Sequence, residues 1–203
     1  MAGYDTTIEK KRREALKVLF DTVRLLDEHN VTYHLEGGTL LGLIREGDLL
    51  PWDHDLDISI MSPDASLVER ILPRLWSKGH KISARSFLKN SYVFQKGQRR
   101  IFKVKLWSSY LRSATSFKGH KPIVLDIFVK YSDEKHIYWA ANKKVMKAPK
   151  SHYNAYDVVT FLGYPFKVPS DPEAYLTLKY GDWKTPVKEW CCAKDEGSVV
   201  GDI

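Results

Sequence analysis

The chain has 203 residues, of which 43% are hydrophobic and 28% are charged. This composition excludes a disordered chain and a coiled coil, and the length predicts a single domain over residues 1–203. The formal charge of +7 favours anionic partners such as phosphates and nucleotides. The sequence shows no signal peptide, no transmembrane segment, and no metal motif around its adjacent cysteines, Cys191 and Cys192. We therefore expect a cytoplasmic protein, at most peripheral to the inner face of a membrane.

Hydrophobic periodicity, capping residues and turn residues predict alternating helices and strands. The expected helices cover 8–29, 39–47, 63–78 and 171–180. The expected strands cover 31–37, 55–61, 80–86, 91–96, 101–107, 122–130 and 136–141, followed by a hairpin at 157–169. Residues 97–100 should join two strands as a hairpin turn, and 108–121 should form a loop. The pattern predicts an α/β (α+β) domain, a mixed β-sheet flanked by helices, with loosely held tails at 1–6 and 189–203.

Three aspartates mark the candidate site. Residues i and i+2 of a strand share a face, so Asp55 and Asp57 should point together, opposite Leu56 and Ile58. Adjacent carboxylates raise each other's pKa unless a cation lies between them, and Mg²⁺ prefers such oxygen ligands. Asp126 lies alone in the most hydrophobic strand, where an unpaired carboxylate is costly to bury. The three predict a site for two Mg²⁺ or Mn²⁺ ions that supports phosphoryl or nucleotidyl transfer. The alternative is a solvated edge strand with exposed aspartates.

Other residues near these aspartates in the sequence are suited to bind phosphate. Glycines ahead of a short helix leave free backbone amides at its positive end, and basic side chains can neutralise phosphate charge. The candidate phosphate ligands are Gly37, Gly38, Thr39, Arg45, Lys103 and Lys105. Trp52 and Asp53, in the loop before the aspartate strand, are candidates for contacts with substrate or with groups around the metal. The alternatives are a surface ion pair for Arg45, a solvent-facing strand for the lysines, and core packing for the tryptophan.

The segment GGTLLGLIREGDLLPWDHDLDISI, together with LDIFV and KYGDW further along, resembles the signature of the LicD/fukutin family. The resemblance covers most of the chain and implies a nucleotidyltransferase-like fold. It also implies transfer of phosphocholine or ribitol phosphate from a CDP-activated donor to a glycan hydroxyl. By the same resemblance, Asp55, Asp57 and Asp126 would hold magnesium, and Gly37, Gly38 and Arg45 would lie near the donor phosphates. Without the membrane anchor and additional domain of fukutin, the chain is expected to be of the compact bacterial type.

The leading hypothesis is attack by a sugar hydroxyl of a glycan or glycolipid on a CDP-alcohol, with release of CMP. Asp126 would bind the ion that polarises the acceptor and is a candidate for the base that takes its proton. The aromatic content, together with the resemblance to the compact family members, favours choline over a polyol as the head group. Candidate cage residues are Trp52, Tyr92, Trp107 and Trp183. The identity of the alcohol, the acceptor and the oligomeric state stay open.

Other functions could use parts of the same pattern. Nucleotidyl transfer from an NTP, with release of pyrophosphate, needs the same three carboxylates. A non-catalytic basic module that binds nucleic acid should have one continuous basic face, whereas here the basic residues are scattered among acids. We therefore expect no stable nucleic acid partner. A metal-dependent glycosyltransferase also uses an Asp-x-Asp pair but fits the glycine turn and Asp126 less well. A haloacid-type phosphatase would need a continuous apolar strand before its aspartates, where this chain has Pro51 and Trp52.

Overall fold

The computed structural model describes residues 2–53, 55–115, 122–187 and 190–203. The α-helices are α1 (Ala2–Glu28), α2 (Gly37–Arg45), α3 (Ala65–Ile71), α4 (Trp107–Thr115), α5 (Pro172–Tyr180) and α6 (Cys192–Asp195). The 3₁₀ helices are η1 (Ser62–Asp64), η2 (Leu72–Lys78) and η3 (Lys150–Tyr153). The strands are β1 (Tyr33–Leu35), β2 (Asp55–Met61), β3 (His80–Ser86), β4 (Arg99–Leu106), β5 (Val124–Ser132), β6 (His136–Ala141), β7 (Lys144–Pro149), β8 (Tyr156–Phe161), β9 (Tyr164–Pro169) and β10 (Val199–Asp202).

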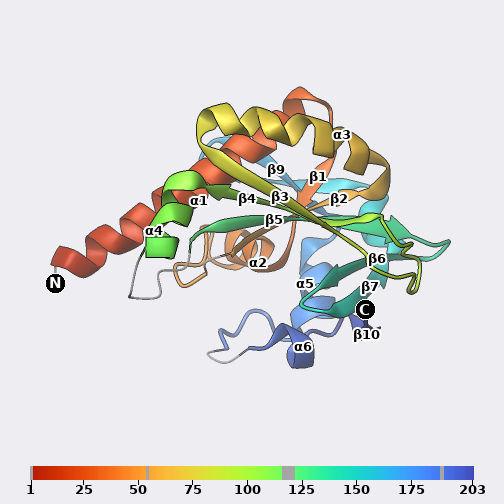
Figure 1. Ribbon diagram of the computed structural model, residues 1–203. Helices are drawn as coiled ribbons and strands as arrows, with labels where there is room; N and C mark the ends of the chain where they lie inside the picture. Colours follow the sequence, from red (N-terminus) through yellow and green to blue (C-terminus); the bar gives the residue numbers. More distant parts are fainter. Residues whose placement is uncertain (1, 54, 116–121, 188–189) are drawn as a thin grey trace.

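A mixed sheet forms the centre of the molecule, with strands in the order β1–β2–β5–β4–β3. Strands β2 and β5 run parallel, and the other neighbours in this part run antiparallel. Past Lys130, the end of β5 leaves β2 and pairs with β6, so β6, β7 and β10 extend the sheet on that side (Figure 1). Strand β5 is buried at every position except Ser132, as expected for a central strand with a nearly continuous apolar sequence. The predicted mixed sheet flanked by helices is confirmed.

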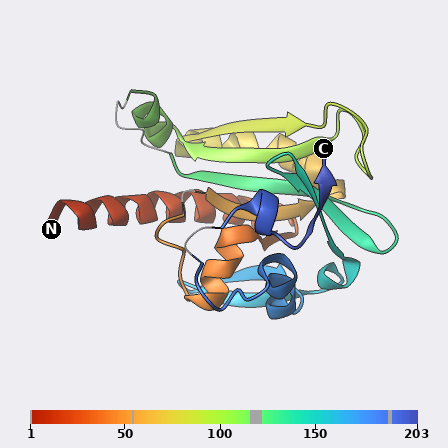
Figure 2. The ribbon, with the colours of Figure 1, turned by 90° about the horizontal axis from the view of Figure 1, so that it is seen from below.

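Helices cover the two faces of this sheet differently. Helices α1 and α3 lie on one face, and α2 and α5 lie on the other, beside the β8–β9 hairpin (Figures 1 and 2). The pleat of β2 explains this, because Leu56, Ile58 and Ile60 are buried toward α1, whereas Asp57 points toward α2. The two aspartates of β2 therefore lie on the face that α2 only partly covers. None of the described helices combines the length and the apolar run that a membrane crossing needs.

The predicted helix at 63–78 is wrong as a single helix. Its α-helical part is only α3, with η1 before it and η2 after it. Pro73 lies in the first turn of η2, where it lacks an amide to continue the α-helical hydrogen bonds. Gly79 ends the segment in the left-handed region with φ of +83°, as its position in the sequence predicted.

Two other local predictions are wrong. Residues 91–96 form a turn rather than a strand, because Tyr92 has a positive φ and Phe94 folds back to stack on Phe87 at 4.1 Å. The hairpin partner of β4 is therefore β3. Residues 108–115, predicted as a loop, belong to α4, which begins at Trp107, the predicted end of a strand. The first turn of α4 contains serines, which suit a helix start. The rest of the predicted loop, 116–121, lies outside the described residues.

The ends of the chain also differ from the expectation. Helix α1 begins at Ala2, so residues 2–6 continue a helix rather than forming a loose tail. Near the other end, β10 pairs with β7, and Glu196 and Ser198 are buried. Strand β7 was missed because its buried residues, Val145, Met146 and Ala148, follow no two-residue alternation and lie in a basic stretch. The predicted hairpin at 157–169 is confirmed as β8–β9, with positive φ at both turn residues, Leu162 and Gly163.

Replacing Gly42 of α2 with alanine should destabilise the fold, although alanine is the better helix former by about 1 kcal/mol. A Cβ at this position would lie 2.7 Å from the backbone oxygen of Asp48 and 3.1 Å from the backbone nitrogen of Leu50. Neither backbone atom can rotate away, so we expect a net loss of about 1–3 kcal/mol in the free energy of unfolding, measured with denaturant. The exposed Ser66→Ala variant on α3 should change it by less than about 0.5 kcal/mol. A G42A protein as stable as the wild type would show that α2 does not hold this loop.

Candidate active site

The α2 side of the sheet carries a cleft with a volume of about 880 Å³. Its floor is formed by strands β2, β5 and β4, and its walls come from the start of α2, the β6–β7 turn and the segment after α5. Of the residues predicted from the sequence, the cleft is lined by Gly37, Gly38, Arg45, Trp52, Asp53, Asp55, Asp57, Lys103, Asp126 and Trp183. Most of the predicted site residues thus meet in one place.

The three predicted aspartates lie on adjacent strands. In the parallel pairing of β2 with β5, Asp57 is directly opposite Asp126, and Asp55 is one pleat away on the same face. Asp126 is buried, Asp57 is half-buried and Asp55 is exposed. On the other side of β5, Lys103 of β4 is opposite Asp126 and donates hydrogen bonds of 2.7 and 2.6 Å to its two oxygens. The alternative of a solvated edge strand is wrong, because β2 is an interior strand.

The electrostatics of the site show an excess of negative charge around Asp57. Burial raises the pKa of the Asp57 carboxyl well above its usual range, and the charges of Asp126 and Asp53 raise it further. Burial also raises the pKa of Asp126, although the hydrogen bonds from Lys103 oppose that rise. A divalent cation would relieve this repulsion more fully than a single ammonium group does.

The donor atoms of this group fit Mg²⁺ or Mn²⁺ in kind, because all of them are carboxylate oxygens. The carboxylates are, however, not yet arranged as a complete set of metal ligands. Within the part of the chain that the structure describes, no three His, Cys, Asp or Glu side chains are gathered as a ready metal site. Instead, the ammonium of Lys103 occupies both oxygens of Asp126. The site therefore has the ligands that a hard cation prefers, with one of them already paired.

The glycine turn packs directly against these carboxylates. Gly37 has φ of +55°, and a Cβ there would lie 2.2 Å from Oδ2 of Asp57. A Cβ on Gly38 would lie equally close to Oδ2 of Asp53. The hydroxyl of Thr39 accepts a 2.9 Å hydrogen bond from the amide of Asp57. Thr39 is buried and outside the cleft lining, so its side chain joins α2 to β2. Its backbone amide, in the first turn of α2, is the part that fits the predicted phosphate contact.

The remaining predicted residues divide into those at the cleft and those away from it. Arg45 pairs with Glu46, as the ion-pair alternative predicted, and donates a 3.1 Å hydrogen bond to the backbone oxygen of Trp183. Its side chain also lies at the edge of the cleft. Lys105 does not line the cleft, although its charge opposes the rise in the pKa of Asp126. Among the aromatic candidates, Tyr92 and Trp107 lie outside the lining. Four aromatic residues that sequence reasoning missed do line it, namely Phe128, Trp139, Tyr180 and Trp190.

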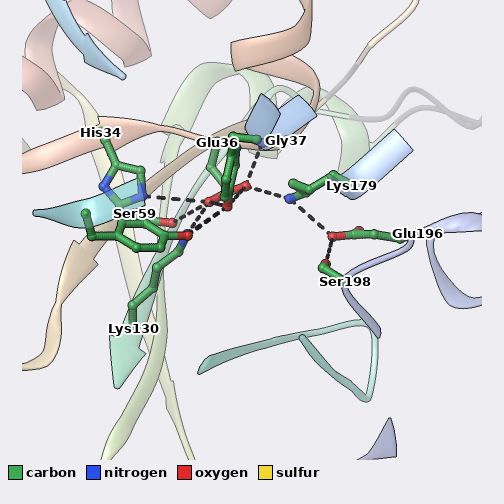
Figure 3. Close-up of polar contacts among 10 residues, drawn as sticks. His34, Glu36, Gly37, Ser59, Lys130, Lys179, Glu196 and Ser198 are labelled. Carbon is green, nitrogen blue, oxygen red and sulfur yellow. Dashed lines mark hydrogen bonds and ion pairs between the residues drawn. The ribbon is translucent and has the colours of Figure 1, made fainter. Parts of the chain in front are cut away.

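Sequence reasoning also missed a buried ionic cluster beneath the glycine turn (Figure 3). Its centre is Glu36, the N-cap of α2, whose carboxylate accepts a 3.2 Å hydrogen bond from the amide of Gly37. The same carboxylate is paired with Lys130 of β5 and with Lys179 of α5, the latter at 2.5 Å. The hydroxyl of Tyr175 also donates to it, at 2.8 and 2.9 Å. The only signals in the sequence were a lysine at the end of the apolar strand and the KYGDW segment that begins at Lys179.

The cluster extends into the C-terminal segment. Lys179 lies 3.2 Å from Glu196, which in turn accepts a 2.5 Å hydrogen bond from Ser198. Burial lowers the pKa of Lys130 to about 8, although Glu36 opposes this shift. Burial would also lower the pKa of Lys179, but Glu36 and Glu196 outweigh it and raise the pKa well above its usual range. With two lysines facing two glutamates, this cluster is charge-balanced, in contrast to the aspartates above it.

Comparison with known proteins identifies the relatives of the chain. The family model described as "LicD/FKTN/FKRP, nucleotidyltransferase domain" matches residues 30–171, which include the glycine turn and all three aspartates. An uncharacterized protein of Rickettsia prowazekii, RP689, is 26% identical over 179 residues, 86% of this chain and 56% of that protein. Human "Ribitol 5-phosphate transferase FKRP" is 26% identical over 176 residues, 82% of this chain and 32% of that protein.

A shorter match joins the chain to a bacterial enzyme. The "Lipopolysaccharide cholinephosphotransferase LicD" of Haemophilus influenzae is 35% identical over 52 residues, 26% of this chain and 20% of that protein. The chain spans about half, or less, of the length of these relatives.

The pH dependence of stability should report His34, a buried neighbour of the ionic cluster. Burial lowers the pKa of His34 from 6.5 to about 4. Between these two pH values the unfolded chain binds a proton that the folded chain does not, so stability should fall as the pH falls. The loss should be on the order of 3 kcal/mol by pH 4. Neither ring nitrogen makes a hydrogen bond in the described part of the chain, although Nε2 lies 3.8 Å from Oε2 of Glu36. Phenylalanine can therefore replace the ring without the loss of a hydrogen bond.

We therefore expect the His34→Phe variant to show a shallower pH dependence than the wild type in denaturant titrations from pH 7 to pH 4. Comparing the two proteins removes the contributions of other titrating groups, because these are common to both. Parallel curves for the two proteins would show that His34 does not stay neutral in the folded state.

Proposed function

Because the chain belongs to the LicD/FKTN/FKRP nucleotidyltransferase-domain family, we propose that it transfers a phospho-alcohol group from a CDP-activated donor to a hydroxyl of a glycan or glycolipid, with release of CMP. The observation that carries this proposal is the meeting of Asp55, Asp57 and Asp126 beside the Gly37–Gly38 turn in one cleft. Relatives are named for transfer of ribitol 5-phosphate and of phosphocholine, which supports the class of group transferred.

The carboxylates have a defined part in this proposal. Asp55, Asp57 and Asp126 would hold two ions of Mg²⁺ or Mn²⁺. When bound, these ions would neutralise the charge of the donor phosphates and polarise the acceptor hydroxyl. Asp126 is the candidate base, because burial raises the pKa of its carboxyl and so makes it a better proton acceptor. Lys103, now held by Asp126, is placed to meet phosphate charge when the carboxylate is otherwise engaged.

The start of α2 is suited to hold the donor phosphates. The first amides of a helix have no partner within the helix and lie at its positive end, which favours an anion there. In α2 the side chain of Glu36 already accepts from Gly37, so the amides of Gly38 and Thr39 are the candidate phosphate donors. Arg45, at the far end of the same helix and on the cleft edge, is placed to meet the rest of the donor.

Aromatic side chains on the cleft wall support a choline-like head group. The rings of Tyr180 and Trp190 lie 5.0 Å apart, and Trp183 and Trp52 line the same cleft. Such rings bind a quaternary ammonium through their electron-rich faces, whereas a polyol needs a matched set of hydrogen-bonding side chains. We therefore propose phosphocholine as the first donor group to test, with polyol phosphates as the alternative.

Replacing the carboxylates should remove activity without unfolding the protein. We expect Asp55→Asn and Asp57→Asn to lower kcat by roughly 10³-fold or more, and Asp126→Asn to be nearly as severe. In metal-free buffer the Asp57→Asn protein should be at least as stable as the wild type, because burial first and the charges of Asp126 and Asp53 second raise the pKa of Asp57, and an uncharged amide avoids both costs. Asp202→Asn is the matched control for turnover, because the Asp202 side chain is 73% exposed, pairs with Lys144 and lies outside the cleft lining. Near-normal turnover of any of the three variants at saturating Mg²⁺ would exclude the two-metal reading.

A donor panel separates the proposal from nucleotidyl transfer by an NTP. The protein is incubated with Mg²⁺ and CDP-choline, CDP-ethanolamine, CDP-ribitol or CDP-glycerol, and separately with each of the four NTPs. We expect slow release of CMP, or a rise in Tm, with at least one CDP-alcohol, because a donor that binds only the folded state stabilises it. Stabilisation by an NTP with pyrophosphate release, and no response to any CDP-alcohol, would replace the proposed function with nucleotidyl transfer.

A further inference from the structure

Two arginines at the β3–β4 side of the cleft have no role in the function described so far. Arg85 of β3 and Arg100 of β4 both line the cleft. In the described part of the chain neither has an ion-pair partner or a side-chain hydrogen bond, and Nε of the half-buried Arg100 is buried without any partner. Buried donors are nearly always satisfied in folded proteins, so an unsatisfied one needs an explanation.

The neighbouring arginine shows that this is not a general property of the strand. Arg99 pairs with Glu69 of α3 and donates a 2.7 Å hydrogen bond to Ser86. By contrast, burial lowers the pKa of Arg100, and the charge of Arg85 lowers it further, with only Asp126 acting in the opposite direction. In the β3–β4 pairing Arg85 is opposite Ile101, the residue next to Arg100, and both arginines line the cleft. Two neighbouring guanidinium groups that are open to a cleft favour an anion between them. A phosphate group matches the fork geometry of both.

The position of this pair relative to the glycine turn indicates which substrate it would hold. Across the sheet, Asp57 of β2 is opposite Asp126 of β5, which is opposite Lys103 of β4, which is opposite Ser83 of β3. Arg85 lies two residues after Ser83 on β3. With strands about 4.8 Å apart, the backbone of Arg85 is on the order of 15 Å from that of Asp57. The glycine turn packs against Asp57, at the opposite end of this row. The aspartates therefore lie between the glycine turn and the arginine pair.

We propose that Arg85 and Arg100 form a subsite for a phosphate group carried by the acceptor. In phosphoryl transfer the attacking and leaving oxygens lie roughly in line, on opposite sides of the transferred phosphorus. If the donor diphosphate binds at the glycine turn, the acceptor must bind on the opposite side of the aspartates, where the two arginines lie. This assignment rests on the proposed function, which fixes the glycine turn as the donor end. The acceptor is accordingly a phosphorylated sugar or polyol, or a glycan with a phosphate next to the reacting hydroxyl.

The test measures binding of glycerol 3-phosphate and of glycerol by calorimetry at constant ionic strength, with CDP-choline as the donor probe. The proteins are the wild type, Arg85→Gln, Arg100→Gln and, as a matched control, Arg70→Gln on the exposed surface of α3. We expect glycerol 3-phosphate, but not glycerol, to bind the wild type and R70Q. Its Kd should rise roughly tenfold or more in R85Q and R100Q, since each change removes charge-assisted hydrogen bonds. The Kd of CDP-choline should change by less than about twofold in all four proteins, because the donor contacts are untouched.

Equal binding of glycerol 3-phosphate to the wild type, R85Q and R100Q would overturn the subsite. Weaker binding of CDP-choline in R85Q and R100Q would show that the anion belongs to the donor, and would overturn the acceptor assignment. Failure of the wild type to bind or turn over any CDP-alcohol would refute the proposed function and, with it, the acceptor assignment. The two failures are distinguishable because the first appears only in the glycerol 3-phosphate measurements and the last only in the donor measurements.

Discussion

The cleft depends on one buried carboxylate, that of Glu36. It caps α2 at the glycine turn and is held by Lys130 from the central strand and by Lys179 from α5. Through Lys179 it also reaches Glu196 in the C-terminal segment. Removing one partner of a buried ion pair typically costs about 3–5 kcal/mol, because the other charge is left in the interior. The turn, the sheet, α5 and the chain end are therefore connected through a few charged contacts, and they define the shape of the cleft.

The two charge clusters of the molecule are different in kind. The cluster around Glu36 is closed and balanced, with each carboxylate facing an ammonium group. The aspartates in the cleft are unbalanced, since Lys103 engages only Asp126 and the pKa of Asp57 is raised. A balanced buried cluster needs nothing further, whereas an unbalanced one beside an open cleft is where a cation and an anionic substrate are stabilised together. The contrast between the two is the physical basis for proposing that the chemistry takes place at the aspartates.

The sequence predicted the parts of the site that depend on local rules. The two-residue period of β2 placed Asp55 and Asp57 on one face, and the isolation of Asp126 in an apolar strand marked it as paired or functional. Contacts between distant segments were beyond such rules. No local pattern shows that Glu36, Lys130 and Lys179 meet. Lys130 is 94 residues and Lys179 is 143 residues from Glu36 in the sequence. Strand parity likewise grouped Lys105 with Lys103, but only the register shows that Lys103 lies beside Asp126.

The fold was predicted in class and missed in detail for the same reason. Pro73 interrupts the helix predicted at 63–78, the positive φ of Tyr92 replaces a predicted strand by a turn, and the irregular burial pattern of β7 concealed a strand. Tyr92 and Trp107 were chosen as cage residues by chain position, and the fold places both outside the cleft. Trp139 of β6, Tyr180 at the end of α5 and Trp190 in the C-terminal segment line the same cleft although they are far apart in the sequence, which no local pattern shows.

The central claim is that the unbalanced aspartates hold divalent cations. Titration with Mn²⁺ at pH 7, monitored by electron paramagnetic resonance, tests this claim most directly. With CDP-choline present, we expect two Mn²⁺ ions to bind per wild-type chain, and fewer and weaker ions to bind to the folded Asp57→Asn protein. Equal stoichiometry and affinity in the two proteins, or no bound Mn²⁺ in the wild type, would contradict the account.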